Sequence, residues 1–326
     1  MGGQSLAELL DTLHVVALHL RTRYRGLGVR EAALLRGPAG WTEFSPFLEY
    51  DDAEAAAWLA AAIDYGWHET PPLLRDRIPV NATLPAVAAS EVPGVLERFG
   101  PVRTVKVKVA ERGQTLADDV ARVRAARAWL GPEGRVRVDA NGGWNVDEAE
   151  HAAHELAPFD LEYFEQPCAS VGELAELRMR LHDWDLPVAA DESVRKADDP
   201  LAVLREGAAD LLVVKAQPLG GIRRALALVA EAGLPVVVSS ALDTSVGLAM
   251  GAALAAALPE LPYDCGLGTA ALLAADVTGH PLVPVDGAIE VRRVEPESRL
   301  LTAHAAGPDR VAWWADRIRR CHALLA

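Results

Sequence analysis

Six short apolar runs in the middle of the chain each end in a polar residue that the interior of a sheet would not normally hold. These residues are, in order, Lys108, Asp139, Glu165, Asp191, Lys215 and Ser239. Successive members lie 31, 26, 26, 24 and 24 residues apart, close to the roughly 30 residues of one βαβ unit. The spacing therefore predicts six successive units, each presenting one polar side chain at the carboxyl end of a strand.

The residues between these positions alternate between strand and helix patterns. The expected strands are Thr104–Val109, Arg135–Asp139, Leu161–Glu165, Pro187–Asp191, Leu211–Lys215 and Pro235–Ser239. The expected helix signals are capping boxes at Thr115 to Asp118 and Ser170 to Glu173, a first helical position at Pro200 and a helix end at Gly233. Such alternation predicts an α/β fold with a parallel sheet, most simply a barrel whose strand ends surround one cavity.

The chain on either side of this region has a different pattern. Three strand candidates and a helix precede it, at Leu13–Leu20, Val29–Leu35, Trp41–Phe47 and Ala53–Tyr65. A strand candidate and a closing helix follow it, at Ile289–Arg293 and Arg310–Leu325, with Trp313 and Trp314 near the buried face of the helix. We expect the tail to pack on the N-terminal block, so that residues 1–77 and 288–326 form a small domain and residues 78–287 form the barrel.

Composition narrows the classes of function. The chain has 326 residues, 51% of them hydrophobic, so its core needs no disulfides. Its formal net charge is −14, so nucleic acid is not an expected partner. The scattered Cys168, Cys265 and Cys321 predict reduced thiols in a cytoplasmic protein. Residues 1–10 show no signal-peptide pattern, and Val246–Leu258 is too short to span a membrane and predicts a buried helix. The sequence leaves the oligomeric state open.

The three acids Asp139, Glu165 and Asp191 follow neighbouring strands, so their carboxylates are expected to converge at the barrel mouth. Carboxylates close together repel one another unless a cation lies between them. An all-oxygen ligand set without His or Cys suits Mg²⁺, with Mn²⁺ as a possible substitute, better than zinc. The alternative is a hydrogen-bonded structural cluster, but three acids in register on successive strands favour a metal site.

Two lysines flank the acids in the strand order, with Lys108 before them and Lys215 after them. Lys106 lies on the same face of the strand as Lys108, and its positive charge is expected to lower the pKa of Lys108. A lysine with a pKa near neutrality can act as a general base. The alternative is that both lysines only pair with the carboxylates, but their symmetric placement favours a role in catalysis.

These parts together suit the removal of a proton next to a carboxylate. Such a proton is very weakly acidic, and its removal places a second negative charge on the carboxyl group as an enediolate. A divalent metal stabilises that charge as a Lewis acid, and a lysine can accept the proton. The expected partner of the protein is therefore a small-molecule carboxylate substrate.

Five motifs in this order resemble the muconate-lactonising subgroup of the enolase superfamily. They are Lys106-Val-Lys108, Asp139-Ala-Asn141, Phe164-Glu165-Gln166-Pro167, Ala190-Asp191-Glu192-Ser193 and Val214-Lys215. Enolase-superfamily sites use lysine or histidine bases with Mg²⁺. The resemblance covers essentially the whole chain and implies a capping domain, formed by the N-terminal segment and the C-terminal tail, on a (β/α)7β barrel.

Carried over to this sequence, the resemblance implies particular roles. Asp139, Glu165 and Asp191 would be the Mg²⁺ ligands, and Lys108 and Lys215 the acid–base pair. Lys106, Asn141 and Glu192 would lie behind these groups and adjust them.

Further segments resemble those members of the subgroup that make 2-succinylbenzoate for menaquinone biosynthesis. They are Val29-Arg30-Glu31, Gly40 to Phe47, Pro79 to Thr83, Pro167-Cys168, Ser239 to Gly247 and, as a last barrel strand, Gly266 to Thr269. The similarity implies a lyase that dehydrates a cyclohexadiene carboxylate bearing a hydroxyl and a succinyl chain. Lys108 would remove the α-proton and assist loss of the hydroxyl, and Lys215 would stabilise the enediolate. Ser239 and the backbone of Gly266 would hold the succinyl carboxylate.

The sequence also has to be compared with what other functions would require. N-succinylamino acid racemase, dipeptide epimerase and muconate cycloisomerase use the same scaffold, and the spacing of the motifs does not separate them. A Schiff-base aldolase needs a buried lysine and no acidic triad, and a non-catalytic barrel would be expected to lose members of this set. The loop Arg21–Gly28 is expected to be a lid whose arginines are solvated.

Overall fold

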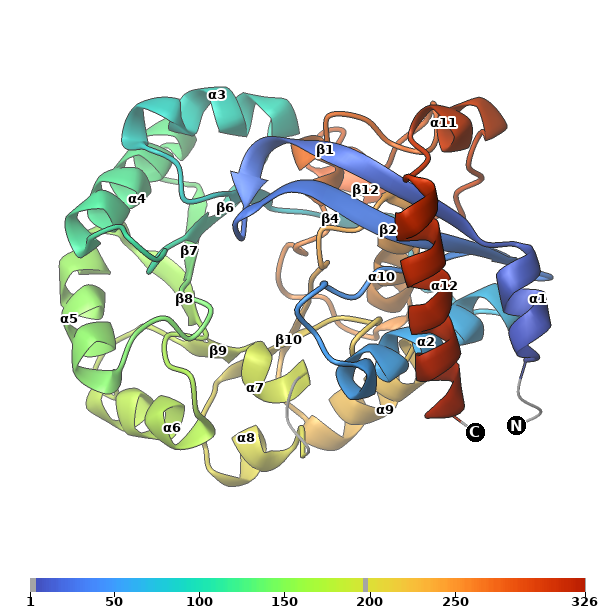
Figure 1. Cartoon of the computed structure of the whole chain (residues 1–326). Helices are drawn as coiled ribbons and strands as arrows, with labels where there is room; N and C mark the ends of the chain where they lie inside the picture. Colours follow the sequence, from blue (N-terminus) through green and yellow to red (C-terminus); the bar gives the residue numbers. More distant parts are fainter. Residues whose placement is uncertain (1–3, 196–198, 326) are drawn as a thin grey trace.

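The computed structural model describes residues 4–195 and 199–325. A long hairpin near the N-terminus reaches across to the mouth of a helix-covered barrel, and the last helix packs along the outer part of that hairpin (Figure 1). The first and last helices lie together on one side of the molecule (Figure 1). The chain therefore forms a small domain from its two ends and a barrel from its middle.

An antiparallel sheet is the centre of the small domain. Its strands, in spatial order, are β1 (His14–Tyr24), β2 (Leu27–Gly37) and β3 (Gly40–Phe44), and α2 (Asp52–Trp67) packs on it. The three predicted strands and the predicted helix are confirmed. The first strand is longer than predicted, because Arg25 and Gly26 turn the chain with φ of 51° and 75°, a tight turn that suits a hairpin. The expected loop at Arg21–Gly28 is therefore the tip of a hairpin.

The C-terminal tail returns to this domain, as predicted. Its elements are β12 (Ala288–Glu290), α11 (Ser298–Ala303) and α12 (Pro308–Ala323), and the last helix packs on α2, β1 and the short α1 (Leu6–Asp11). Trp314 of α12 is fully buried and meets Phe44 edge-on. Its Nε1 donates a hydrogen bond to Glu31 at 2.7 Å, so the last helix is fixed to β2 by packing and by a polar contact.

We expect Trp314→Ala to lower the free energy of unfolding by about 3–5 kcal/mol, because truncating a core aromatic leaves a cavity. Urea unfolding followed by circular dichroism measures the change. The matched control is Trp313→Ala, at the next position of the same helix and only partly buried, which should cost clearly less. Equal losses in the two variants would contradict the argument from burial.

Seven parallel strands form the barrel sheet, in the spatial order β11–β10–β9–β8–β7–β6–β5. They are β5 (Ala82–Leu84), β6 (Thr104–Lys108), β7 (Arg135–Asp139), β8 (Leu161–Glu165), β9 (Val188–Ala190), β10 (Leu211–Val214) and β11 (Val236–Val238). All six predicted barrel strands are present. Single parallel bridges, Ser239 to Gly266 and Val80 to Cys265, join the two edges of the sheet through one segment, so the predicted barrel is confirmed.

The eighth position of the barrel is irregular. The last strand predicted at Gly266–Thr269 is wrong, because only the bridges at Cys265 and Gly266 lie there and Thr269 begins a 3₁₀ helix, η4 (Thr269–Leu272). Just before the bridge at Val80, β4 (Arg77–Pro79) pairs antiparallel with β12. The domain boundaries expected near residues 77 and 287 fall at this pair of strands and stay predictions.

Helices surround the barrel (Figure 1). They are α3 (Val92–Leu96), α4 (Leu116–Leu130), α5 (Val146–Leu156), α6 (Val171–Arg180), α7 (Glu192–Arg195), α8 (Ala202–Arg205), α9 (Ile222–Ala232) and α10 (Ser245–Ala257), with 3₁₀ helices η1 (Ala89–Glu91), η2 (Glu97–Phe99) and η3 (Ala157–Phe159). The capping boxes that begin at Thr115 and Ser170 and the left-handed end at Gly233 are confirmed. The prediction for Pro200 is wrong, because α8 begins at Ala202 with Leu201 as its N-cap.

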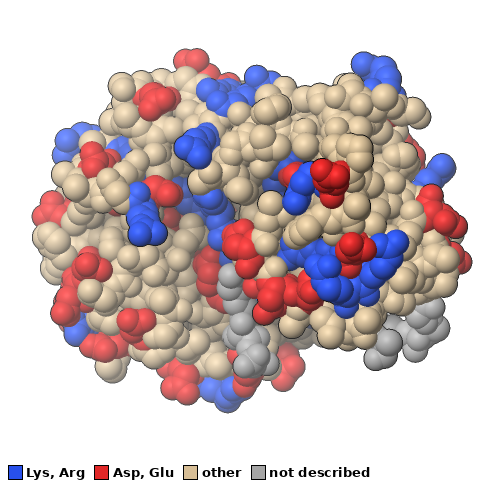
Figure 2. All heavy atoms as spheres, in the orientation of Figure 1, with Lys and Arg blue, Asp and Glu red and all other residues tan. Residues whose placement is uncertain are grey.

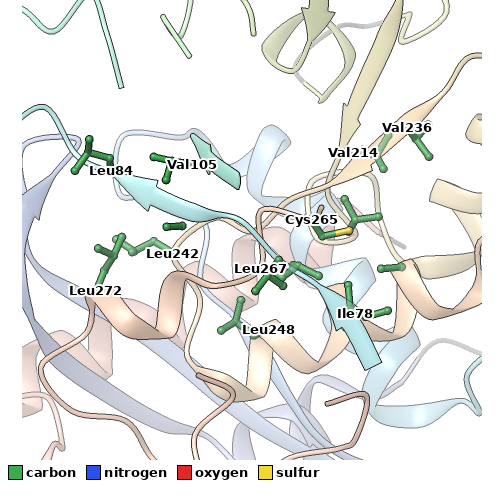
Figure 3. Packing of buried hydrophobic residues seen from close by; sticks show 14 of the residues in the cluster. Ile78, Leu84, Val105, Val214, Val236, Leu242, Leu248, Cys265, Leu267 and Leu272 are labelled. Carbon is green, nitrogen blue, oxygen red and sulfur yellow. The ribbon is translucent and has the colours of Figure 1, made fainter. Parts of the chain in front are cut away.

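The main hydrophobic core lies between the strands and the helices around them. Figure 3 shows Val105, Val214 and Val236 of three barrel strands within it, and Leu248 of α10 beside Leu267. Helix α10 is buried over nearly its whole length, which confirms the buried helix predicted at Val246–Leu258. Its small residues allow close packing, since a Cβ on Gly251 would lie 2.7 Å from the Leu267 side chain.

The surface carries both signs of charge. Acidic residues outnumber basic ones, 46 to 32, and Figure 2 shows the two kinds mixed over one face of the molecule. Across residues 4–195 and 199–325, no helix has the length and apolar character needed to cross a membrane.

Candidate active site

Side chains alternate along the barrel strands, and this alternation places the polar strand ends inside the barrel. An apolar cluster separate from the main core contains Tyr163, Ala189, Leu211, Val213 and Val237. Each polar strand end follows a member of this cluster by two residues and so lies on the same face of its strand. These strand ends are Glu165, Asp191, Lys215 and Ser239. The interior of the barrel is therefore polar at the mouth and mostly apolar below it, where the buried Arg137 of β7 lies over the Tyr163 ring.

One pocket opens at this mouth. Its walls include eight of the predicted residues, Lys106, Lys108, Asp139, Asn141, Asp191, Lys215, Ser239 and Gly266. Register brings the strand ends level, because Lys108 pairs with Asp139 and Asp139 with Glu165 across neighbouring strands. Glu165 and Glu192 do not reach the wall and lie behind it.

Lys106 and Lys108 both contact the acids of the next two strands. The Nζ of Lys106 donates to Glu165 Oε1 at 2.7 Å and lies 3.1 Å from Asp139 Oδ2. The Nζ of Lys108 donates to the same Asp139 oxygen and to Asn141 Oδ1, the latter at 2.6 Å. The ammonium groups thus lie between the carboxylates and neutralise their charge.

On the other side of the pocket, Asp191 accepts hydrogen bonds from Lys215 and from Arg195. The Arg195 Nε donates at 3.0 Å, and its Nη1 donates to the Tyr50 hydroxyl of the small domain at 3.0 Å. Glu192 accepts from Arg195 at 2.5 Å and from Asn141 Nδ2 at 3.1 Å. Sequence reasoning missed Arg195 and Tyr50; the spacing of Arg195, four residues after Asp191 on a helix, is the one local signal that could have found it.

The pKa values of the two lysines shift in opposite directions. Burial lowers the pKa of Lys215, and the negative charge of Asp191 opposes this only in part. Burial also acts to lower the pKa of Lys108, but Asp139 and other negative groups outweigh it and raise the pKa. The prediction that Lys106 leaves Lys108 with a lowered pKa is therefore wrong, because its effect, although of the expected sign, is smaller than that of Asp139.

The pKa values of the acids reflect the same contacts. Burial acts to raise the pKa of Asp139 and of Asp191, but the nearby lysines outweigh it and lower both. Burial and then the charge of Asp139 raise the pKa of Glu165 to about 8. Glu165 is thus the acid whose charge the described residues compensate least.

The donor chemistry at this mouth fits a divalent cation. The Oε2 of Glu165 is buried and has no hydrogen-bond donor among the described residues, and the three acids offer only the oxygen ligands that hard cations prefer. Among the described side chains, no group of three His, Cys, Asp or Glu residues is arranged to hold a metal, and lysine ammonium groups contact all three acids. The lysines must move away from these carboxylates for a cation to bind there.

The small domain supplies the roof of the pocket through Tyr24, Arg25, Phe47, Tyr50 and Trp58. The ring of Tyr24, at the hairpin tip, has its centroid 5.6 Å from Lys108 Nζ. The guanidinium of Arg25 lies over the Phe47 ring at 4.5 Å. The expectation that the arginines of this loop are only solvated is wrong for Arg25, which the hairpin turn directs at the pocket.

The far wall is the segment Ser239–Leu242 with Gly266 and Thr269. The Gly266 N–H already donates to Val238 O at 2.8 Å, and its carbonyl oxygen accepts from the Ser240 N–H. The backbone of Gly266 is therefore not available for a carboxylate in this arrangement, contrary to expectation. Its missing side chain matters instead, because a Cβ there would lie 2.5 Å from Ser239 Oγ.

Two family descriptions match the chain, "Enolase N-terminal domain-like" over residues 15–66 and "Enolase C-terminal domain-like" over residues 86–296. Among curated relatives, o-succinylbenzoate synthase of Mycobacterium marinum is 57% identical over 325 residues, 99% of this chain and 97% of the relative. The enzyme of the same name from Mycobacterium leprae is 58% identical over 322 residues, 98% of this chain and 94% of the relative.

Solved structures of lower identity share the fold. A muconate lactonizing enzyme from Pseudomonas fluorescens superimposes with a TM-score of 0.77 at 20% identity, covering 90% of this chain and 98% of its own. An N-succinyl Arg/Lys racemase from Bacillus cereus gives a TM-score of 0.75 at 18% identity, covering 90% and 97%. At these identities the likeness concerns architecture alone.

Proposed function

We propose that this chain, which belongs to the o-succinylbenzoate synthase family of the enolase superfamily, is a lyase that dehydrates 2-succinyl-6-hydroxy-2,4-cyclohexadiene-1-carboxylate to 2-succinylbenzoate. The observation that carries the proposal is one pocket in which Lys108 and Lys215 flank Asp139 and Asp191, with Glu165 of the strand between them behind the wall. The relatives of this name match nearly the whole chain. The product is an intermediate of menaquinone biosynthesis, which is the pathway we propose for the protein.

The three acids are the proposed ligands of the metal. Enzymes of this superfamily use a divalent metal ion, and we propose Mg²⁺, held by Asp139, Glu165 and Asp191. When bound, such an ion supplies Lewis-acid stabilisation of negative charge on the substrate carboxylate. The partnerless Oε2 of Glu165 supports this assignment, as does the absence of sulfur and imidazole from the ligand set.

Lys108 is the proposed base. Its Nζ would accept the α-proton of the substrate, which leaves an enediolate, and would then return that proton to the departing hydroxyl so that water is lost from the same face. Lys215, on the far side of the acids, would stabilise the enediolate by its charge. Both amines are now paired with carboxylates, so each must leave its partner to face a substrate.

The remaining side chains would orient these groups. Asn141 contacts Lys108 and Glu192, and Arg195 contacts Asp191 and Glu192, so together they link the two sides of the pocket. Ser239 is the residue we propose for the succinyl carboxylate. Tyr24 and Phe47 would exclude water from above.

The proposed function is tested by a steady-state assay with the succinyl-hydroxycyclohexadiene carboxylate in the presence of Mg²⁺. We expect rapid conversion to 2-succinylbenzoate, followed by absorbance. The control substrates are N-succinylamino acids and dipeptides, whose α-proton exchange would be followed by NMR. Efficient exchange on these substrates without any dehydration would overturn the proposal in favour of a racemase or an epimerase.

A further inference from the structure

Two segments that the sequence analysis singled out place buried charges where the small domain meets the barrel. Arg30 on β2 and Glu43 on β3 are 2% and 1% exposed. Neither is among the residues that line the pocket. Both reach instead to the barrel segment Ser239–Gly247, which follows β11 and leads into α10.

Arg30 holds the first part of this segment through carbonyl groups. Its Nε donates to Leu242 O at 3.1 Å and its Nη2 to Ala241 O at 3.3 Å. From the small domain, the same guanidinium contacts Ser45 Oγ at 3.0 Å and lies over the Phe47 ring at 4.6 Å. Arg30 is therefore fixed on one side and holds the barrel segment on the other.

The turn that Arg30 holds needs such support. Leu242 has a φ of 63°, a left-handed conformation that leucine rarely adopts. Residues in such conformations persist when their surroundings hold them there. The two hydrogen bonds from Arg30, to Leu242 and to the residue before it, act on this strained turn.

Glu43 holds the second part of the segment through N–H groups. Its carboxylate accepts from Thr244 Oγ1 at 2.6 Å, from the Thr244 N–H at 3.2 Å and from the Gly247 N–H at 3.0 Å. A helix leaves the N–H groups of its first turn unpaired, so Glu43 caps α10 from another domain. The fit is close, since a Cβ on Gly247 would lie 2.8 Å from Glu43 Cδ.

A second carboxyl group, that of Asp243, stabilises the same turn from the barrel side. Asp243 accepts from the Ala241 N–H and from Gln217 Nε2, both at 3.2 Å. Burial and the charge of Asp243 raise the pKa of Glu43 to about 7, and burial raises the pKa of Asp243 while Arg30 opposes it. The charge of Arg30 opposes the rise of both pKa values, so the arginine stabilises the two buried carboxyl groups as well as the turn.

The segment held in this way is a wall of the pocket, because Ser239, Ser240, Ala241 and Leu242 all line it. We propose that Arg30 and Glu43 are positioning residues that fix this wall from the small domain. If the substrate is the one given under the proposed function, on which this inference rests, the two residues determine how tightly its succinyl chain is bound. They do not touch the reacting groups. Their removal should therefore affect binding of the chain more than the chemistry at the ring carboxylate.

The first test compares kinetics and product binding in Arg30→Met. We expect KM to rise at least tenfold with a smaller fall in kcat. By calorimetry, the Kd of 2-succinylbenzoate should rise at least tenfold, and the Kd of benzoate, which lacks the chain, should stay within twofold. Arg36→Met, an exposed arginine on the same strand, is the matched control and should bind both ligands like the unchanged protein. Equal weakening of both ligands in Arg30→Met, or no weakening, would overturn the positioning role.

The second test does not depend on the reaction. Hydrogen exchange followed by mass spectrometry should show residues 239–247 exchanging at least tenfold faster in Arg30→Met and in Glu43→Gln, with β7 unchanged. Glu49→Gln, at an exposed glutamate of the same domain, should leave both regions unchanged. Unaltered exchange over residues 239–247 would overturn the inference. Failure of the unchanged protein to bind 2-succinylbenzoate would overturn the proposed function, and exchange would still decide whether the two residues hold the wall.

Discussion

Replacing Lys108 by arginine is expected to reduce kcat for dehydration by at least about 1000-fold, within the range that a general base contributes. The variant keeps a positive charge beside Asp139, so the loss would report proton transfer. A guanidinium stays protonated in proteins and cannot accept the α-proton. Lys215→Arg should cost less than the roughly 100-fold that loss of a stabilising donor usually costs, because the proposed role of Lys215 needs only its charge.

Alanine variants complete this comparison. Lys108→Ala and Lys215→Ala should each abolish dehydration and leave thermal unfolding cooperative, since both side chains end at a pocket and not in the core. Steady-state assays on the four variants, with Mg²⁺ saturating, give the comparison. Near-normal turnover by Lys108→Ala would remove Lys108 from the role of base. Equal losses in the two arginine variants would mean that both amines transfer protons.

The distribution of lysine along the chain agrees with a base in this pocket. Only four of the 32 basic residues are lysines, and Lys106, Lys108 and Lys215 all line the pocket at the barrel mouth. The fourth, Lys196, lies outside the described residues. Elsewhere among the described residues, arginine supplies the positive charge of ion pairs, as in Arg103 with Asp264. Among the described residues, lysine is therefore confined to the pocket in which the proposed base, Lys108, must lose and regain a proton.

The order and spacing of strand ends could be predicted because two simple physical rules fix them. Side chains alternate along a strand, and parallel βα units repeat at a nearly constant length. These rules place Asp139 and Glu165 at the ends of β7 and β8, with the predicted bounds. They apply to each strand by itself, so no knowledge of distant contacts is needed.

Other features depend on contacts between distant parts of the chain. The Arg195 contact with Tyr50 joins residues 145 positions apart, and the direction of the Lys108 pKa is a sum over several buried charges. The hydrogen bond that occupies the Gly266 N–H depends on how the barrel closes. These outcomes depend on no local pattern, so the direction of the Lys108 pKa was predicted wrongly and the pairing of the Gly266 N–H was not predicted, although both residues lie in the pocket.

Removal of the divalent metal by chelation is expected to abolish dehydration, and Glu165→Gln to weaken Mg²⁺ binding by at least roughly 100-fold. Loss of a residue behind a metal ligand already costs about 10–100-fold in affinity, and Gln removes a charged oxygen from the ligand itself. Calorimetric titration of Mg²⁺ into chelator-treated protein measures the affinity. Thermal unfolding gives a second readout, because a ligand at 100 times its Kd stabilises the folded state by about 2.7 kcal/mol.

The control separates loss of a ligand from loss of charge in general. Glu155→Gln removes one negative charge at an exposed site on α5 and should bind Mg²⁺ like the unchanged protein. If Glu165→Gln bound Mg²⁺ equally well, the partnerless oxygen of Glu165 would not be a ligand, and its burial beside Lys106 would be only structural. If dehydration persisted in excess chelator, the reaction would not need a metal ion, and Lys108 and Lys215 would have to stabilise the enediolate alone. Asp139 would then keep only Lys106, and Asp191 only Arg195, as a neighbouring positive charge.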